Sequence, residues 1–391
     1  MSQSRKHDRL RSTLVVSEVA LACMLLIGAG LLLRSFLRVL DVDLGFQPGH
    51  AAAIKLDYDD AGDPARRGAI LQNVLARVGE IPGIESAGIA DMLPLDRNRG
   101  WGFLAKENFG DKRRHGAFVY VVTPGYLDAM GMRLREGRDF NWHDQTHSEP
   151  VIIINQAAAR REWPGRDPIG RLAYGIGRGE TRVVGVISDV RESSVEDVSG
   201  AQVYIPMTQA DPEGAELVVR TKLPPDTLAS SVMRTLRSIN PGQPANEFRP
   251  IQQIVDHAVS PRRFFVLLVT SFAALGLILA SLGIYGVISY SVTRQTQEIG
   301  IRMALGATAG RVQMAVIQET LRLALTGIAA GTVASFAGAR GIASLLFGTE
   351  PTDPATFAAM ILLLTGVALV AGYIPARRAS RIDPMTALRS N

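Results

Sequence analysis

The sequence predicts a membrane protein in which an α-helical four-span bundle carries an extracytoplasmic α+β domain inserted between spans 1 and 2. Two observations support this fold class. With 47% hydrophobic and 20% charged residues, the chain is too apolar for an ordinary soluble protein and too charged to lie wholly in a membrane. Apolar runs of about the 20 residues needed to span a bilayer lie near both ends, and residues 41–261 contain none.

The first span is predicted from the run 13–33, which only Glu18 interrupts. A basic flank precedes it, with Arg5, Lys6, Arg9 and Arg11 against Asp8, so the flank is expected on the cytoplasmic side. The run is longer than the centre of a secretory signal and no small-residue cleavage site closes it, which favours a membrane anchor. Glu18 is expected to make an interfacial or interhelical hydrogen bond, with a proton relay as the alternative.

Arg34 and Arg38 fall on the outer side of the first span, against the charge rule. They lie four residues apart on a predicted helical extension, 31–40. We interpret them as interfacial anchors.

Residues 41–261 have the pattern of a water-soluble domain with a core of its own and two subdomains. Six runs favour strands: 53–58, 118–122, 151–155, 181–188, 202–205 and 217–221. Five favour helices: 65–78, 124–130, 156–162, 227–239 and 251–258. The alternation predicts an α+β or α/β domain.

Three further spans follow this domain, so both termini are expected in the cytoplasm. The loop after the second span and the tail are rich in arginine, whereas the turn 347–356 has no Lys or Arg. The predicted segments are a cytoplasmic arm (1–12), the first span and stalk (13–40), the extracytoplasmic domain (41–261), the second span (262–290), a cytoplasmic loop (291–320), the third span (321–346), an outer turn (347–356), the fourth span (357–375) and a cytoplasmic tail (376–391).

Several functions are excluded by the motifs that the sequence lacks. It has no Gly-x-x-x-x-Gly-Lys-Ser/Thr phosphate loop, no Gly-x-Ser-x-Gly elbow and no His-Glu-x-x-His or paired-cysteine metal signature. Catalysis, a bound cofactor and a metal are therefore not expected. His143 and His147 have zinc-like spacing, but their polar surroundings favour a solvated turn. The net charge of +5 lies largely beside the spans, where anionic lipid explains it, so lipid rather than nucleic acid is the expected partner.

Residues 294–310, RQTQEIGIRMALGATAG, separate the second and third spans. Ile299, Met303 and Gly306 recur at helical spacing, which predicts a short interfacial helix. Glu298 and Arg302 are four residues apart and can pair on one face.

The third span carries a ridge of small residues at four-residue intervals: Gly327, Gly331, Ser335 and Ala339. Such a ridge allows another helix to approach closely. We expect a packing seam, either within the bundle or across a dimer.

Four stretches give the chain a family resemblance. Residues 298–307, EIGIRMALGA, resemble the EIGILRALGA signature of FtsX-like permeases, the membrane subunits of MacB-type ABC transporters. The tail 375–389 is similar to that family's closing PARRAARLDPVEALR. Residues 122–140 and 154–170 resemble the MacB-like periplasmic core domain. The first span looks most like the second half of the duplicated permeases of this group.

The resemblance implies a permease in the bacterial inner membrane that works with a separate ABC ATPase, which would bind the ATP. In the family, the loop after the second span is a coupling helix for that ATPase. The matching positions are Glu298, Ile299, Gly300, Arg302, Ala304, Leu305, Gly306 and Ala307. The resemblance also implies a homodimer or a homologous permease half, and it admits a periplasmic adaptor and an outer-membrane channel. Export is the expected direction of transport.

Three alternatives stay open at this point. The chain could be an FtsX-like relay that regulates a cell-wall hydrolase without moving a solute, or an orphan half without an ATPase. The loop helix could also lie in the headgroup region without docking on a partner.

Overall fold

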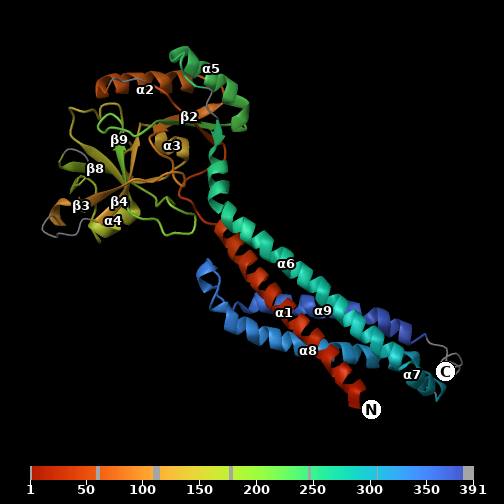
Figure 1. Ribbon diagram of the computed structural model, residues 1–391. Coiled ribbons are helices and arrows are strands. Elements are labelled where there is room, and N and C mark those ends of the chain that lie inside the picture. The colour runs from red at the N-terminus through yellow and green to blue at the C-terminus, as the bar shows by residue number, and fades with distance from the viewer. Residues whose placement is uncertain are drawn as a thin grey trace. The chain divides into compact units, whose positions relative to one another are not determined.

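The computed structural model describes residues 2–58, 62–108, 115–175, 179–244, 248–305 and 307–381, with side chains from Leu10 onward. The chain divides into two compact units (Figure 1). The helical unit combines Met1–Asp41 with Arg262–Asn391, and the inserted unit is Val42–Pro261. Each unit is considered by itself.

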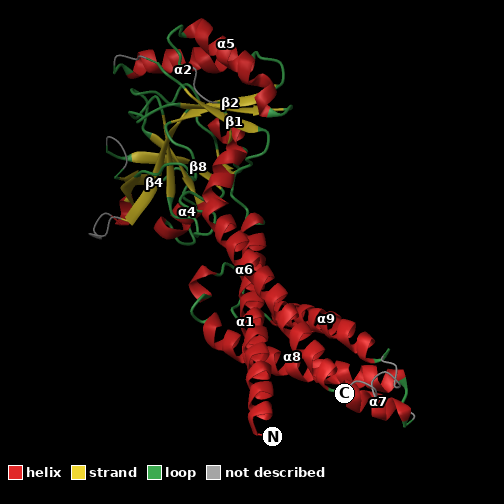
Figure 2. Cartoon of the chain, turned by 45° about the vertical axis from the view of Figure 1, so that its right-hand side comes forward, coloured by secondary structure: helices red, strands yellow, loops and turns green. Residues whose placement is uncertain are grey.

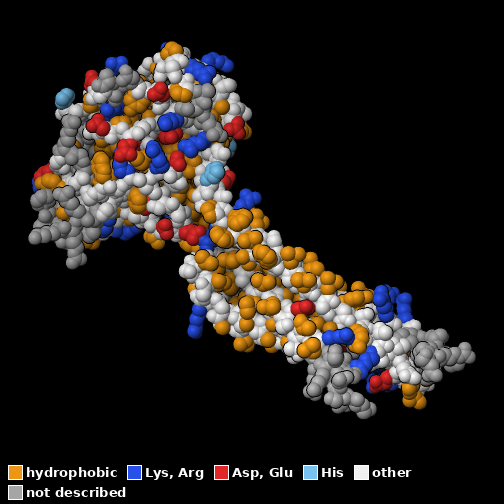
Figure 3. Space-filling view, in the orientation of Figure 1, with side chains coloured by type: hydrophobic (Ala, Val, Ile, Leu, Met, Phe, Trp, Pro, Cys, Tyr) orange, Lys and Arg blue, Asp and Glu red, His pale blue; other side chains and the backbone are white. Residues whose placement is uncertain are grey.

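Four long helices build the helical unit. They are α1 (Ser2–Leu40), α6 (Ile251–Arg294), α8 (Ala309–Ala339) and α9 (Pro354–Ala379); α6 contributes its first turns to the inserted unit. The short α7 (Thr296–Ala304) and the 3₁₀ turn η3 (Ala343–Leu345) complete it. Within the described residues, four helices are long and apolar enough to cross a membrane. Hydrophobic side chains cover much of their surface (Figure 3).

The third of these helices has bounds that differ from the prediction. α8 begins at Ala309 rather than at residue 321, and it ends at Ala339 rather than at residue 346. Its buried residues form one stripe from Val312, Val316 and Thr320 through Ala324 to the small residues beyond. The charged residues of its first half, Arg311, Glu319 and Arg322, lie exposed outside this stripe. An amphipathic first half therefore continues into an apolar second half as one helix.

α8 packs closely against α1 through glycine. A Cβ added at Gly327 would lie 2.7 Å from the Cβ of Val19, and one at Gly331 would lie 2.5 Å from the carbonyl oxygen of Ala20. α9 approaches α8 in the same way, because a Cβ at Gly372 would lie 2.5 Å from the Cγ2 of Thr320. Larger residues at these three positions would push the helices apart.

Glu18 packs against α6. A Cβ at Gly283 would lie 2.2 Å from Glu18 Oε2. Among the residues that the structure describes, no donor reaches this carboxylate, so the interhelical hydrogen bond is not formed there, and the interfacial one stays a prediction.

The turn before α9 is tied to α1 and α6 by polar contacts. Arg34 forms an ion pair with Asp353, whose carboxylate also accepts a hydrogen bond from the Thr356 amide at 2.9 Å and caps α9. The buried Ser35 Oγ accepts from the Phe347 amide at 2.6 Å and from Arg262 Nη2 at 3.2 Å. Arg34, the first of the two arginines that opposed the charge rule, thus has a carboxylate partner within its own chain.

The described residues of the inserted unit form one sheet of eleven strands. They are β1 (Ala51–Lys55), β2 (Ile84–Ala90), β3 (Gly100–Ala105), β4 (His115–Val122), β5 (Leu134–Gly137), β6 (Val151–Asn155), β7 (Leu172–Tyr174), β8 (Thr181–Ile187), β9 (Gln202–Pro206), β10 (Glu216–Thr221) and β11 (Arg249–Pro250). Their order is β11-β1-β10-β2-β4-β3-β7-β8-β6-β9, and β5 pairs with β8. Because β9 also pairs with β4 in parallel, the six strands from β4 to β9 along this order close into a ring.

Helices cover both faces of the open part of the sheet. α2 (Pro64–Gly79) and α5 (Ala229–Ile239) lie side by side over one face (Figure 2), where they bury Ile54, Ile89 and Val219. The short α3 (Tyr126–Met130) lies against the other face, beside β2 and β10. There a Cβ at Gly88 would lie 2.3 Å from the Cα of Tyr126, so only glycine allows this contact. α4 (Gln156–Glu162) packs on the ring.

All six strands predicted from the sequence are confirmed, with small differences at their ends, and so are the four helices that lie within 65–239. The run 251–258 is the start of α6. β2, β3, β5, β7 and β11 were not predicted. β2 and β3 carry glycines and lack clear alternation, and the other three have four residues or fewer.

We predict that Gly331→Ala separates α8 from α1, because the new methyl group would meet the Ala20 carbonyl. The buried thiol of Cys23 is next to this contact, with Sγ 3.8 Å from the Ile328 carbonyl oxygen. Overpacking costs about 1–3 kcal/mol, so thermal unfolding of the chain in detergent should occur at a lower temperature. A thiol-reactive dye on Cys23 should report the change.

Gly338→Ala in the same helix is the matched control, because nothing lies within 4 Å of a Cβ there. It should leave the labelling of Cys23 unchanged. Equal labelling rates and melting temperatures for the two variants would contradict the packing described here.

Candidate functional site

The short helix predicted within residues 294–310 is present as α7. It follows α6 after a single residue, Gln295, and Ile299 and Gly300 are buried on its inner side. Ile299 belongs to the apolar core of the helical unit, and Met303 packs against that core. α7 is therefore held on the bundle by its own side chains.

The outer face of α7 presents one ion pair and two large apolar side chains. Glu298 pairs with Arg302, and both are exposed. Ile301 is 44% exposed and Leu305, just after the helix, is 84% exposed. Isolated apolar side chains on a surface are common, but these two are four residues apart and lie on the same side. Together they form a small apolar surface beside a fixed ion pair.

The predicted coupling residues thus divide into two groups. Glu298, Arg302, Ala304 and Leu305 are exposed, Ala307 is half-buried, and Ile299 and Gly300 are buried. Gly300 is buried on the inner side of α7 and does not contribute to the exposed face. Gly306 lies outside the described residues. Ile301 was not among the predicted residues, although its spacing of four from Leu305 could have identified it.

Polar side chains surround the start of α7. The guanidinium of Arg11 lies 4.2 Å from the centre of the Tyr290 ring, and Ser291 Oγ donates to Glu319 Oε1 at 3.4 Å. A cavity of about 170 Å³ lies among these residues and Arg294. This end of the bundle is therefore charged and aromatic, as expected where helices leave a membrane.

The predicted small-residue ridge lies on the buried side of α8. All four of its residues are buried: Gly327, Gly331, Ser335 and Ala339. The two glycines face α1, and Ser335 Oγ donates to the Gly331 carbonyl at 2.7 Å. At the two glycines, the ridge packs against α1 of the same chain.

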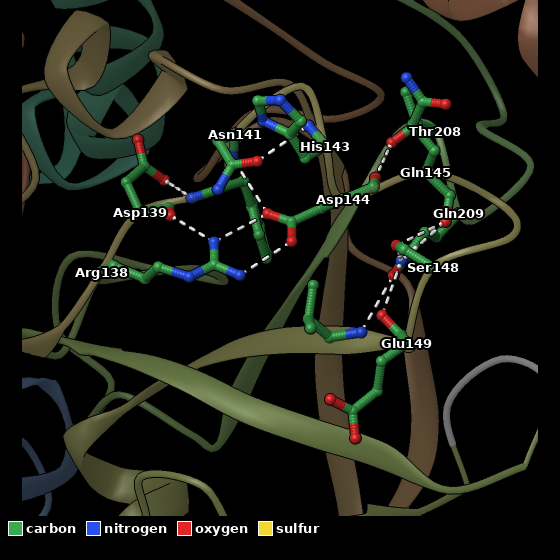
Figure 4. Close-up of polar contacts among 12 residues, drawn as sticks. Arg138, Asp139, Asn141, His143, Asp144, Gln145, Ser148, Glu149, Thr208 and Gln209 are labelled. Carbon is green, nitrogen blue, oxygen red and sulfur yellow. Dashed lines mark hydrogen bonds and ion pairs between the residues drawn. The ribbon is translucent and has the colours of Figure 1, made fainter.

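The loop that contains His143 is ordered by a polar network (Figure 4). Arg138 donates two hydrogen bonds of 2.8 Å to the carboxylate of Asp144. Asp144 also accepts from the Asn141 amide at 2.9 Å, and Asn141 Oδ1 accepts from the His143 amide at 2.8 Å. In this network His143 contributes its backbone amide. No group of three or more possible metal ligands occurs among the described residues.

In the part of the chain that the structure describes, four helices long and apolar enough to cross a membrane, with an inserted sheet domain, define a membrane protein with a separate folded domain. Residues 12–239 match the MacB-like periplasmic core domain, and residues 270–384 match the C-terminal part of FtsX-like permeases. The chain belongs to the FtsX-like permeases with a MacB-like periplasmic core domain.

Several curated proteins are similar to this chain. The macrolide export ATP-binding/permease protein MacB of Neisseria meningitidis is 27% identical over 288 residues, which cover 70% of this chain and 43% of MacB. The pyoverdine export ATP-binding/permease protein PvdT of Pseudomonas syringae is 26% identical, covering 83% of this chain and 49% of PvdT. The uncharacterized ABC transporter permease YknZ of Bacillus subtilis is 23% identical, covering 70% of each chain. The chain thus spans about half the length of MacB and PvdT.

Among solved structures, the periplasmic region of MacB from Actinobacillus actinomycetemcomitans matches with a TM-score of 0.37 and 15% identity. The match covers 56% of this chain and 95% of that structure.

We predict that Asp144→Asn destabilises the 138–149 loop at neutral pH. Burial acts to raise the pKa of Asp144, but the hydrogen bonds from Arg138 and the Asn141 amide hold that pKa below its ordinary value. A carboxylate whose pKa is lower in the folded state stabilises the fold at pH values above its pKa in the unfolded chain, about 4. This stabilisation is lost as the pH falls through the pKa of the folded state. The substitution should therefore cost about 1–3 kcal/mol at pH 7, and the cost should shrink below about pH 4.

The fluorescence of Trp142, which lies within this loop, should report the unfolding. Glu149→Gln is the control, because Glu149 forms an exposed ion pair with Arg182, worth about 0–1 kcal/mol. An Asp144→Asn effect of the same size at pH 7 and pH 3 would show that the carboxylate charge is not what stabilises the loop.

Proposed function

We propose that this chain is the permease subunit of a MacB-type ABC transporter, and that α7 is the surface on which a separate ATPase docks. The observation that supports this most directly is the exposed pair Ile301 and Leu305 on a helix anchored by Ile299. An apolar helix face that fits a partner's groove is a recurring docking mode. Because α7 is fixed on the core between α6 and α8, a push on it would be passed to both helices.

The source of energy follows from the motifs. The given sequence has no phosphate loop, so we propose that the ATP is bound by the partner. MacB and PvdT are named as ATP-binding/permease proteins, and this chain aligns with less than half the length of each. Export is proposed by analogy with these two relatives.

The proposed topology has four spans, cytoplasmic termini and an extracytoplasmic inserted unit, in the bacterial inner membrane. The arginine-rich α7 loop and the tail would lie in the cytoplasm, and the turn 347–356, which has no Lys or Arg, would lie outside. The Arg34 to Asp353 ion pair supports this assignment, since it supplies a counter-charge to an arginine on the outer side. We further propose a second permease copy or homologous half as partner, and a periplasmic adaptor with an outer-membrane channel for onward export.

We predict that Leu305→Asp releases the ATPase. Burying a leucine side chain contributes about 1.5–3 kcal/mol, so placing a carboxylate there should weaken binding at least about tenfold. The test is affinity purification of the tagged full chain from its own membranes in mild detergent, followed by identification of any co-purifying protein with a phosphate loop.

Leu345→Asp is the matched control, since Leu345 is 57% exposed in the turn η3 and lies outside α7. It should retain the ATPase. Equal retention by both variants would exclude α7 as the docking surface, and the absence of an ATPase from the native chain would exclude an energised permease. If the ATPase binds but reconstituted vesicles transport no solute, the FtsX-like relay becomes the better hypothesis.

A further inference from the structure

The inserted unit contains a cavity of about 610 Å³ that has no role in the proposed coupling. It lies between α4, β5 and the loop 164–168. Four of its residues, Gln156, Ala159, Arg160 and Trp163, recur at helical spacing along α4 and at its C-cap. One side of this helix therefore forms one wall of the cavity.

Three arginines from three different segments line this cavity: Arg135 of β5, Arg160 of α4 and Arg166 of the loop. Two of them are held in place by partners. Arg135 Nε donates to Ser188 Oγ at 2.7 Å, and Arg160 Nη2 donates to Asp189 Oδ2 at 2.6 Å. The guanidinium of Arg166 has no partner among the described residues. Each of the three therefore has N–H groups left to donate.

Two carboxylates, Glu136 and Asp167, also line the cavity. Asp167 Oδ1 accepts from the Ile169 amide at 2.8 Å, so part of its hydrogen-bonding capacity is already used within its loop. Glu136 has no partner within the described part of the chain. Together with Asp189, which forms an ion pair with Arg160, these carboxylates balance the charge of the three guanidinium groups. The cavity therefore offers a ligand the unused N–H donors of the arginines, and Glu136 remains able to accept one hydrogen bond.

The remaining wall is apolar. Trp163 is only 2% exposed, and its Nε1 donates to Glu107 at 2.8 Å, which fixes the indole ring. Ala159, Pro168 and Val186 contribute the other apolar atoms. The volume falls within the range of about 300–1,000 Å³ for small-molecule sites.

We propose that this cavity binds a small organic anion through a carboxylate or phosphate group held by Arg135, Arg160 and Arg166. Guanidinium groups match both anions with paired hydrogen bonds. Glu136 would accept from a hydroxyl or amine of the same ligand, and the half-buried Ala159 in front of the buried Trp163 would contact its carbon skeleton. Anion binding at this cavity does not depend on coupling to an ATPase, so its test is independent of the proposed function.

The test is a titration of the purified full chain in detergent with citrate and, separately, with inorganic phosphate, at constant ionic strength maintained with sodium chloride. Intrinsic tryptophan fluorescence and the melting temperature are the readouts, because Trp163 lines the cavity. Saturable binding of at least one anion is expected. Arg166→Gln should weaken it about tenfold or more, since a hydrogen bond to a charged group contributes about 1.5–3 kcal/mol.

Arg237→Gln is the control of equal charge change, because Arg237 is exposed on α5 and does not line this cavity. It should leave the affinity unchanged, and both variants should melt like the native chain without anion. A linear, unsaturated response to both anions would overturn the proposal. The proposal would also be overturned if both variants weakened anion binding equally, or if Arg166→Gln did not weaken it.

Discussion

The close approach of α8 to α1 is the contact on which the helical unit depends. Gly327 and Gly331 place the backbone of α8 directly against Val19 and Ala20. From this contact the buried stripe of α8 runs back to Val312 and meets α9 at Thr320. Apolar side chains gain little by leaving lipid for one another, so close packing has to supply the association energy. Glycine makes that packing possible by removing the side chain between two backbones.

α7 takes its position from the same arrangement. Its inner side is anchored by Ile299 in the apolar core that α1, α6, α8 and α9 share, and its outer side exposes Ile301 and Leu305. At the other end of the bundle, Ser35, Arg34 and Arg262 fix the turn before α9. Both ends of the helices are therefore held by specific contacts.

The inserted unit is packed differently, around a sheet. Six strands close into a ring, and the strands beyond it are covered by helices on both faces. Closure removes exposed strand edges from that part of the sheet. Two arginines of the α4 cavity, Arg160 and Arg166, come from α4 and the loop directly after it, whereas Arg135 comes from β5. No linear motif marks this set, because only the fold brings β5 beside α4 and its loop.

The sequence by itself determined the family, the four apolar segments and most strands of the inserted unit, because composition, periodicity and local motifs are properties of neighbouring residues. Only the tertiary structure decided which face each residue presents. It placed Gly300 inside and Ile301 outside, extended α8 through a polar stretch whose charged residues lie exposed, and gave Arg34 a partner at Asp353. Short strands such as β5 and β7 form because a neighbouring strand pairs with them. Such choices depend on contacts between distant segments, which no local pattern records.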